Sequence, residues 1–347
     1  MIRIASYITC LLVFTNIVNS KGTLELHSHA FMKPGLGHLF KGDFEGELRA
    51  KSWKNKLSSQ VNAEELRKSD IKIMVIALYS HPILSAIYYK KIKDSARIAI
   101  RHEIEKVNNF VTENPEWVIA KNAKEASEHL KLGKKIIILS LEGAHSVLET
   151  EEDLKEFIDE KKVSIVTFTH LVNSKFAGAA YMKGILESIG TTRIFTCNKS
   201  EGVHANPKGL SKNGEWLANE LIKRKVWIDL THSSDQTQKE LIPKLIKAKQ
   251  PLLFTHTVLR KYYQAERGLA EWQIQLIKKH GGFVGIIPGE DMLKDNRKVK
   301  NHQDHCDDSL GNLVKQYNEL QTQIGNQNIS LGSDFNGGIR HLKMPSC

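Results

Sequence analysis

Eight short apolar segments recur along the chain, and helical patterns separate most of them. Most of the segments are near-continuous apolar runs, as expected of strands that are buried on both faces. The alternation of strand and helix predicts a parallel α/β fold, and eight strands in a chain of 347 residues favour a (β/α)₈ TIM-type barrel over an open doubly wound sheet. The predicted strands are residues 23–27, 71–78, 135–142, 164–170, 226–232, 251–256, 283–287 and 329–334. The clearest helical stretches are "NGEWLANELIKRK", "SDQTQKELIPKLIKAK", "AEWQIQLIKKH" and "SLGNLVKQYNELQTQI".

Most of these predicted strands end in a histidine or a carboxylate. In a barrel of this type the carboxyl ends of the strands form the rim on which active sites are built. A single polar residue at such an end could be structural, but its recurrence from strand to strand indicates a functional site. The residues in question are His27, His29, Glu142, His170, His232, His256 and Asp334.

The side chains at these ends suit zinc or a similar divalent ion. His27 and His29 are two residues apart in an extended segment and therefore point the same way. Four histidines and one glutamate exceed the three protein ligands of a single open catalytic zinc. If Glu142 bridges two ions, the first histidine pair completes one of them, and His232 with His256 completes the other. The ions would lie roughly 3.5 to 4 Å apart, and water held between them would be deprotonated near neutral pH.

The first twenty residues have the layout of a secretory signal peptide: one charge, Arg3, then an apolar run, then the small residue Ser20. The apolar run is too short to span a bilayer comfortably. We therefore expect an exported protein, periplasmic or secreted, without stable membrane insertion, in which residues 21–347 form a single domain. The 13 residues after Asp334 do not comfortably hold an eighth barrel helix. That helix is therefore expected to be missing, or strand eight to be covered otherwise.

The distribution of charge and the cysteine content argue against other classes of protein. The formal net charge is +11, but the lysines are scattered among acids, and no basic stripe interleaved with aromatics predicts nucleic-acid binding. Cys197, Cys306 and Cys347 remain after export and permit one disulfide of undetermined pairing.

The cluster "NHQDHCDD" precedes a helix, so we interpret it as capping residues rather than a metal site. His38 is interpreted as a residue of the long loop from residue 30 to 70, which would roof the active site.

Six segments, taken in order, resemble the membrane (renal) dipeptidase family of the amidohydrolase superfamily. They are "LEGAHSV", "TFTHLVNS", "KGLSKNGEWLANELIKRKVWIDLTHSS", "LLFTHT", "ERGLAEWQIQLIKKHGGFVGI" and "LGSDFNGG". The resemblance extends from about residue 23 to the end. It implies a metal-dependent amidohydrolase barrel with two zinc ions that hydrolyses amide bonds in small dipeptide-like substrates.

The resemblance also implies roles for individual residues. Glu142 would bridge the metals, with His232 and His256 on the second ion. His170 would bind the substrate and stabilise the oxyanion, and Asp334 would accept a proton from the attacking water and pass it to the leaving amine. Two further residues match family positions. Arg267 would hold the free carboxylate of the substrate, with a surface loop arginine as the alternative, and His145 would orient the site from behind the ligands.

One departure from the family concerns the first strand. The chain has His-Ser-His where these dipeptidases carry His-x-Asp. An imidazole in place of a carboxylate removes one negative charge from the first metal, which should become more Lewis acidic.

The sequence therefore predicts an exported dinuclear zinc hydrolase of dipeptides or similar small amides. The substrate would be a small molecule, and a homodimer is among the expected assemblies. One alternative keeps the metal site for lactones or N-acylamino acids, because such barrels host many reactions. Another is a non-catalytic protein that binds metal or peptide.

Overall fold

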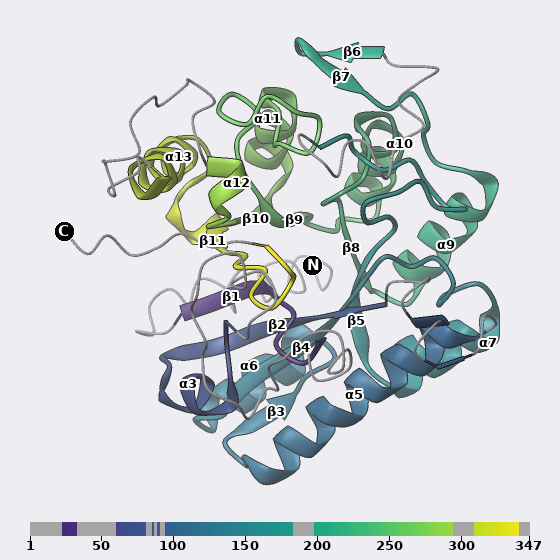
Figure 1. Ribbon diagram of the computed structural model, residues 1–347, viewed down its shortest axis with the longest axis vertical. Helices are drawn as coiled ribbons and strands as arrows, with labels where there is room; N and C mark the ends of the chain where they lie inside the picture. The colour runs from purple at the N-terminus through teal and green to yellow at the C-terminus, as the bar shows by residue number, and fades with distance from the viewer. Residues whose placement is uncertain are drawn as a thin grey trace, which may run out of the picture. The chain divides into compact units, whose positions relative to one another are not determined.

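In the computed structural model (Figure 1), the chain forms two compact units. The first comprises residues up to Val166 with Lys223–Trp227 and Phe335–Gly337, and the second comprises the remainder. The structure describes residues 23–32, 60–80, 85–86, 89–90, 94–182, 198–293 and 309–339. Several predictions therefore fall outside the described residues: the leader at 1–20, His38 and most of its loop, the cluster at 301–308, and Cys197, Cys306 and Cys347.

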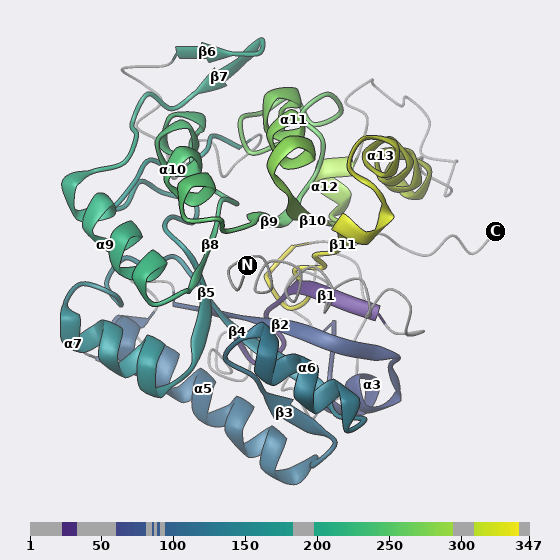
Figure 2. The same ribbon diagram turned by 180° about the vertical axis from the view of Figure 1, so that it is seen from behind.

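The first unit contains a parallel sheet with helices packed on it. Strand β2 pairs in parallel with β1 and with β4, and β3 pairs with β4. Helix α5 packs against β2 and β3, and α6 against β4 (Figure 2). The strands are β1 (Thr23–Ser28), β2 (Ile71–Tyr79), β3 (Trp117–Ile119), β4 (Lys135–Glu142) and β5 (Val163–Thr167). The helices are α3 (Ala63–Lys68), α5 (Ser95–Glu113), α6 (Ala123–Lys131), α7 (Glu151–Asp153) and the π-helical η2 (Leu154–Glu160).

Burial explains why these segments form strands and helices. Six consecutive residues of β2 are buried, which fits its run of aliphatic side chains. Along α5, Ile100, Ile104, Val107 and Phe110 recur at helical spacing and are all buried. Helix α6 begins after Asn122, whose side chain accepts the backbone N–H of Glu125 at 3.0 Å, an ordinary N-cap.

In the second unit, β9 pairs in parallel with β8 and β10, and β10 pairs in parallel with β11. Helix α13 packs against α11 and α12 (Figure 1). The strands are β8 (Trp227–Asp229), β9 (Leu252–Thr257), β10 (Gly282–Ile286) and β11 (Ile329–Leu331), with an antiparallel hairpin of β6 (Asn198–Ser200) and β7 (Val203–Ala205). The helices are α9 (Lys212–Lys223), α10 (Asp235–Lys247), α11 (Glu271–His280), α12 (Glu290–Leu293), α13 (Ser309–Ile324) and the 3₁₀ turn η3 (Asn326–Asn328).

All eight predicted strands and all four named helices are present. Three strands end three residues earlier than expected. Strand β5 stops at Thr167, so His170 lies beyond it, and β8 and β11 stop at Asp229 and Leu331, so His232 and Asp334 lie beyond them. At the last two residues φ is positive, 65° at His232 and 55° at Asp334, which an extended strand does not allow. The sequence analysis missed β3 and the hairpin because three-residue strands show too little periodicity. No helix of the described residues is both long and apolar enough to cross a bilayer.

Candidate metal centre

The first cluster of candidate ligands lies within the first unit and consists of His27, His29 and Glu142. All three side chains are buried, at 0%, 3% and 2% exposure. The Nε2 atoms of the two histidines are 3.2 Å apart. One carboxylate oxygen of Glu142 lies 3.5 Å from His27 Nε2, and the other lies 3.1 Å from His29 Nε2. The structure thus brings these three residues together.

The strands around this cluster explain its geometry. Glu142 is the last residue of β4 and is paired in register with Tyr79, the last residue of β2. The backbone N–H of His29 donates to the carbonyl of Phe335 at 2.8 Å, which fixes the chain just after β1. The Tyr79 ring meets the His29 ring edge-on, with centroids 6.0 Å apart.

Low solvent access shifts two pKa values beside the cluster. Burial raises the pKa of the Tyr79 phenol, and the nearby charge of Glu142 raises it further. Burial also raises the pKa of Glu103 to about 8, although Glu103 accepts the backbone N–H of Tyr79 at 3.0 Å. The first cluster therefore lies where water has little access, so water would compete only weakly with the ligands of a bound metal ion.

The second cluster lies within the second unit and centres on His232 and His256. Their Nε2 atoms are 2.9 Å apart, and both residues are buried. The ring of His170 contacts the ring of His232 edge-on, with centroids 4.6 Å apart. A terminal guanidinium nitrogen of Arg267 lies 3.4 Å from His232 Nε2. The structure thus brings together four of the predicted site residues in this unit.

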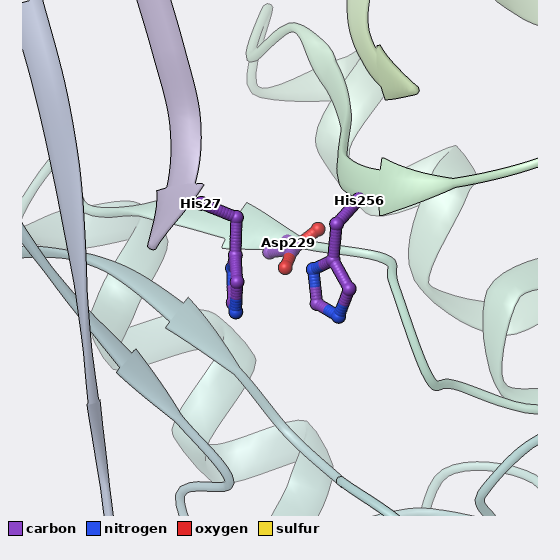
Figure 3. A group of neighbouring side chains, drawn as sticks. All are labelled: His27, Asp229 and His256. Atoms are coloured by element: carbon purple, nitrogen blue, oxygen red, sulfur yellow. The ribbon is translucent and has the colours of Figure 1, made fainter. Parts of the chain in front are cut away.

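His232 is held by its backbone as well as by its side chain. Its carbonyl accepts the N–H of Ala180 at 2.7 Å and the hydroxyl of Thr169 at 3.1 Å. Left-handed backbone at a non-glycine residue costs about 1 to 3 kcal/mol and persists where surrounding contacts impose it. Figure 3 shows His256 projecting from β9 and the Asp229 carboxylate at the end of β8.

Arg267 is not a surface arginine, so that alternative is wrong. It is 4% exposed, and its guanidinium donates to the carbonyl of His256 at 2.6 Å. The neighbouring Glu266 anchors this loop by accepting three backbone N–H groups, from Tyr181, Asn206 and Asp235, at 2.8 to 2.9 Å. Burial raises the pKa of Glu266 to about 7 in spite of these bonds.

The two remaining predicted residues are Asp334 and His145. Asp334 is 8% exposed and follows β11 in the left-handed conformation. His145 is half-buried. The strand before Asp334 must approach β9 closely: a Cβ atom on Gly332 would lie 2.0 Å from the carbonyl oxygen of Thr255, so only glycine fits there.

Both histidine pairs have the spacing that a shared metal ion requires. With Zn–N bonds of about 2.0–2.1 Å and tetrahedral angles, two ring nitrogens on one zinc lie roughly 3.3 Å apart. The observed separations are 3.2 Å for His27 and His29, and 2.9 Å for His232 and His256. Imidazole nitrogens and a carboxylate are also the ligands that zinc accepts. The residues therefore fit divalent metal ions.

Three buried acids around the clusters were not predicted from the sequence: Asp229, Glu103 and Glu266. Two of them have a signal in the sequence. Asp229 interrupts the apolar run "VWIDL", and Glu103 lies among the buried positions of α5. A carboxylate at a core position is rare unless it has partners, so such residues indicate a hydrogen-bond network. Their partners, however, lie far away in the sequence.

Comparison with known proteins yields a consistent set of matches. The family model for membrane dipeptidases, peptidase family M19, matches residues 36–344. Dipeptidase 3 of Mus musculus is 22% identical over 297 residues, which cover 86% of this chain and 52% of the relative. Dipeptidase verJ of Clonostachys rogersoniana is 23% identical over 223 residues, covering 63% of this chain and 48% of the relative. The chain spans about half the length of the curated relatives it matches.

Solved structures with a similar fold include two metallopeptidases. The dipeptidase AC, of family M19, has a TM-score of 0.66 and 14% identity, over 91% of this chain and 85% of that chain. A Rhodobacter sphaeroides metallopeptidase, bound to a phosphinate mimic of L-Ala-D-Ala, has a TM-score of 0.65 and 14% identity, over 91% and 86%. At such identities the likeness shows the fold, and the predicted (β/α)₈ TIM-type barrel is confirmed.

Proposed function

We propose that this chain, which belongs to the membrane dipeptidase family, is a metal-dependent hydrolase that cleaves the amide bond of dipeptides or similar small amides. The observation that carries the proposal is the pair of histidine clusters with ligand spacing, one in each unit. Family membership supports the same activity class.

We propose that the chain binds two divalent metal ions, and that the metal is zinc, because the candidate ligands fall into two sets. His27 and His29 would hold one ion, and His232 and His256 the other. Two nitrogens do not complete a zinc site, which takes four ligands or three with an open position. Glu142 has two carboxylate oxygens, each beside a histidine of the first pair. In our proposal Glu142 would supply a ligand to each ion.

When bound, such ions polarise an amide carbonyl and lower the pKa of water to near neutrality. The remaining steps fall to side chains of the second unit. Arg267 would bind the carboxylate of the substrate through its guanidinium. His170 would donate a hydrogen bond to the carbonyl oxygen as negative charge develops there. Asp334 would take the proton released from water on its carboxylate and deliver it to the leaving amine.

The number of ions per chain tests this proposal directly. We expect two in the wild type, and one or none in Glu142→Gln, because the amide cannot bridge as a carboxylate does. Glu128→Gln is the matched control, since Glu128 is 58% exposed in a surface ion pair. Chelation should abolish hydrolysis and zinc should restore it. Full activity in chelator would contradict the proposal.

The choice of substrate needs a separate assay. A panel of dipeptides set against lactones and N-acylamino acids separates the amide hydrolase from its closest alternative. Turnover confined to lactones would move the proposal to that reaction. Bound metal with no turnover on any member would instead indicate a non-catalytic binding protein.

We also propose that the protein is exported, on the layout of residues 1–20. Expression of the full chain in a secreting host, followed by N-terminal sequencing, tests this. We expect a mature chain that begins near residue 21 in the periplasm or medium. An intact leader on cell-associated protein would contradict export.

A further inference from the structure

The side chains of Asp229, Thr255 and His256 form a continuous hydrogen-bonded chain between β8 and β9. Asp229 is fully buried. Its Oδ1 accepts the backbone N–H groups of Thr231 at 3.0 Å and of Thr255 at 3.1 Å. Its Oδ2 faces the hydroxyls of Thr167 at 2.9 Å and of Thr255 at 2.7 Å. The Thr255 hydroxyl in turn lies 3.0 Å from His256 Nδ1.

The chain has a direction because a threonine hydroxyl has a single hydrogen. A carboxylate offers acceptors alone, so the hydroxyl of Thr255 donates its hydrogen to Asp229. What Thr255 presents to His256 is then an oxygen lone pair. Two acceptors do not form a hydrogen bond, and the contact at 3.0 Å therefore requires a hydrogen on His256 Nδ1.

We propose that Asp229 and Thr255 are positioning residues that fix His256 as its Nδ1–H tautomer and thereby keep the Nε2 lone pair available for metal. The ligand role of Nε2 rests on the proposed function, whereas the tautomer does not. A metal-binding histidine commonly donates its other N–H to an oxygen, which sets ring orientation and raises ligand basicity. Here a hydroxyl, polarised by a buried carboxylate, is that oxygen.

The backbone around Thr255 and His256 keeps the relay in place. Besides Gly332, Gly285 also lies against β9, where an added Cβ would fall 1.9 Å from the Thr255 carbonyl oxygen. On the other side, Arg267 donates to the carbonyl of His256 at 2.6 Å. These contacts confine the backbone of β9 at Thr255 and His256, from which the hydroxyl and the imidazole project.

Direct metal binding by Asp229 is the competing interpretation, because its carboxylate is close enough to His256 to share an ion. The four hydrogen bonds argue against it. Two come from backbone N–H groups, which can only donate, and two from hydroxyls directed at the other oxygen. A carboxylate engaged in this way serves better as an anchor for its donors than as a ligand.

Nuclear magnetic resonance of ¹⁵N-labelled histidine reads the tautomer without any metal. The full-length protein is treated with chelator at mildly alkaline pH, and the signal of His256 is the one lost in His256→Gln. We expect His256 to be protonated on Nδ1 in the wild type and in Thr255→Ser, which keeps the hydroxyl. In Thr255→Val, Nδ1 loses its acceptor and Nε2 can donate to His232, so the hydrogen should shift to Nε2. Protonation on Nε2 in the wild type, or an unchanged tautomer in Thr255→Val, would overturn the inference.

Zinc affinity, measured by competition with a chelator, tests the ligand role. We expect Thr255→Val to bind one of its two ions about 10- to 100-fold more weakly, and Thr255→Ser to stay close to the wild type. Equal affinities for the Val and Ser variants would overturn the positioning role. A wild type that binds no zinc would contradict the proposed function instead, while the tautomer would still decide whether the relay operates.

Discussion

The two histidine clusters differ in what surrounds their ligands. In the first unit the cluster includes its own carboxylate, Glu142, whose oxygens lie beside the two histidines. In the second unit the acidic groups near the histidines are engaged with the protein itself: Asp229 accepts four hydrogen bonds, and Glu266 accepts three backbone N–H groups. In the first cluster the carboxylate faces the histidine nitrogens, whereas near the second cluster the carboxylates accept hydrogen bonds from the surrounding protein.

This difference has a consequence for stability. Acids that act as anchors are expected to be costly to remove, because their donors lose an acceptor inside the protein. Acids that face solvent should matter far less. The comparison can therefore be tested by substitutions in which the removed group is the same but its surroundings differ.

The largest effect is expected for Asp229→Ala. The substitution leaves two backbone N–H groups and two hydroxyls without their acceptor, and each buried unsatisfied donor costs about 1 to 3 kcal/mol. We expect the free energy of unfolding, measured by denaturant titration in chelator, to fall by about 4 kcal/mol or more. The control in the first unit is Asp159→Ala, whose side chain is 42% exposed and pairs with Lys121 and Arg224. It should lose less than about 1 kcal/mol. Equal losses would remove the distinction between anchor and surface acid.

The next effect separates two arginine–aspartate pairs, each joined by two hydrogen bonds. Arg260 and Asp235, in the second unit, are 4% and 3% exposed and joined by contacts of 2.7 and 2.8 Å. Arg97 and Asp153, in the first unit, are 16% and 9% exposed, with contacts of 2.6 and 2.8 Å.

Arg260→Met strands a buried carboxylate and should cost about 3 to 5 kcal/mol. Arg97→Met leaves a less deeply buried carboxylate that still accepts the backbone N–H groups of Glu149 and Thr150, so we expect about 1 kcal/mol. Methionine keeps most of the apolar stem in both variants. Thermal or denaturant unfolding measures both values. A larger loss for Arg97→Met would contradict the ranking.

The two clusters also differ in how far the sequence predicts them. His27 and His29 are two residues apart on a strand, and Glu142 ends an apolar run, so strand geometry alone brings them to one rim. The relay from Asp229 to His256 depends on a threonine hydroxyl that has no distinctive sequence pattern. Likewise, β8 ends at Asp229, three residues before the end that the apolar run predicts, and His232 beyond it has a left-handed backbone. Periodicity predicts strands and helices, but not contacts between residues that are distant in the sequence.

The last comparison concerns two buried glutamates, one in each unit, whose carboxylates accept different numbers of backbone N–H groups. Glu103 accepts one, from Tyr79, and its pKa is raised to about 8. Since the ordinary value is 4.5, the folded protein holds a proton between these pH values that the unfolded chain has released. Stability should therefore fall as pH rises through this window, by at most about 1.4 kcal/mol per pH unit.

Glu103→Gln keeps an oxygen for the Tyr79 N–H and removes the titration. The variant should be as stable as the wild type near the acidic end of the window and become progressively more stable than the wild type toward pH 8.

Glu266→Gln should instead destabilise the protein. Three N–H groups would share one amide oxygen, and the amide N–H₂ would face donors, so we expect a loss of about 1 to 3 kcal/mol. Denaturant unfolding across this pH range, in chelator, measures both variants against wild type. If Glu103→Gln follows the wild-type pH dependence, the raised pKa is refuted. If Glu266→Gln is as well tolerated as Glu103→Gln, the anchoring role of the second unit's acids is refuted, because the number of donors bound would then make no difference.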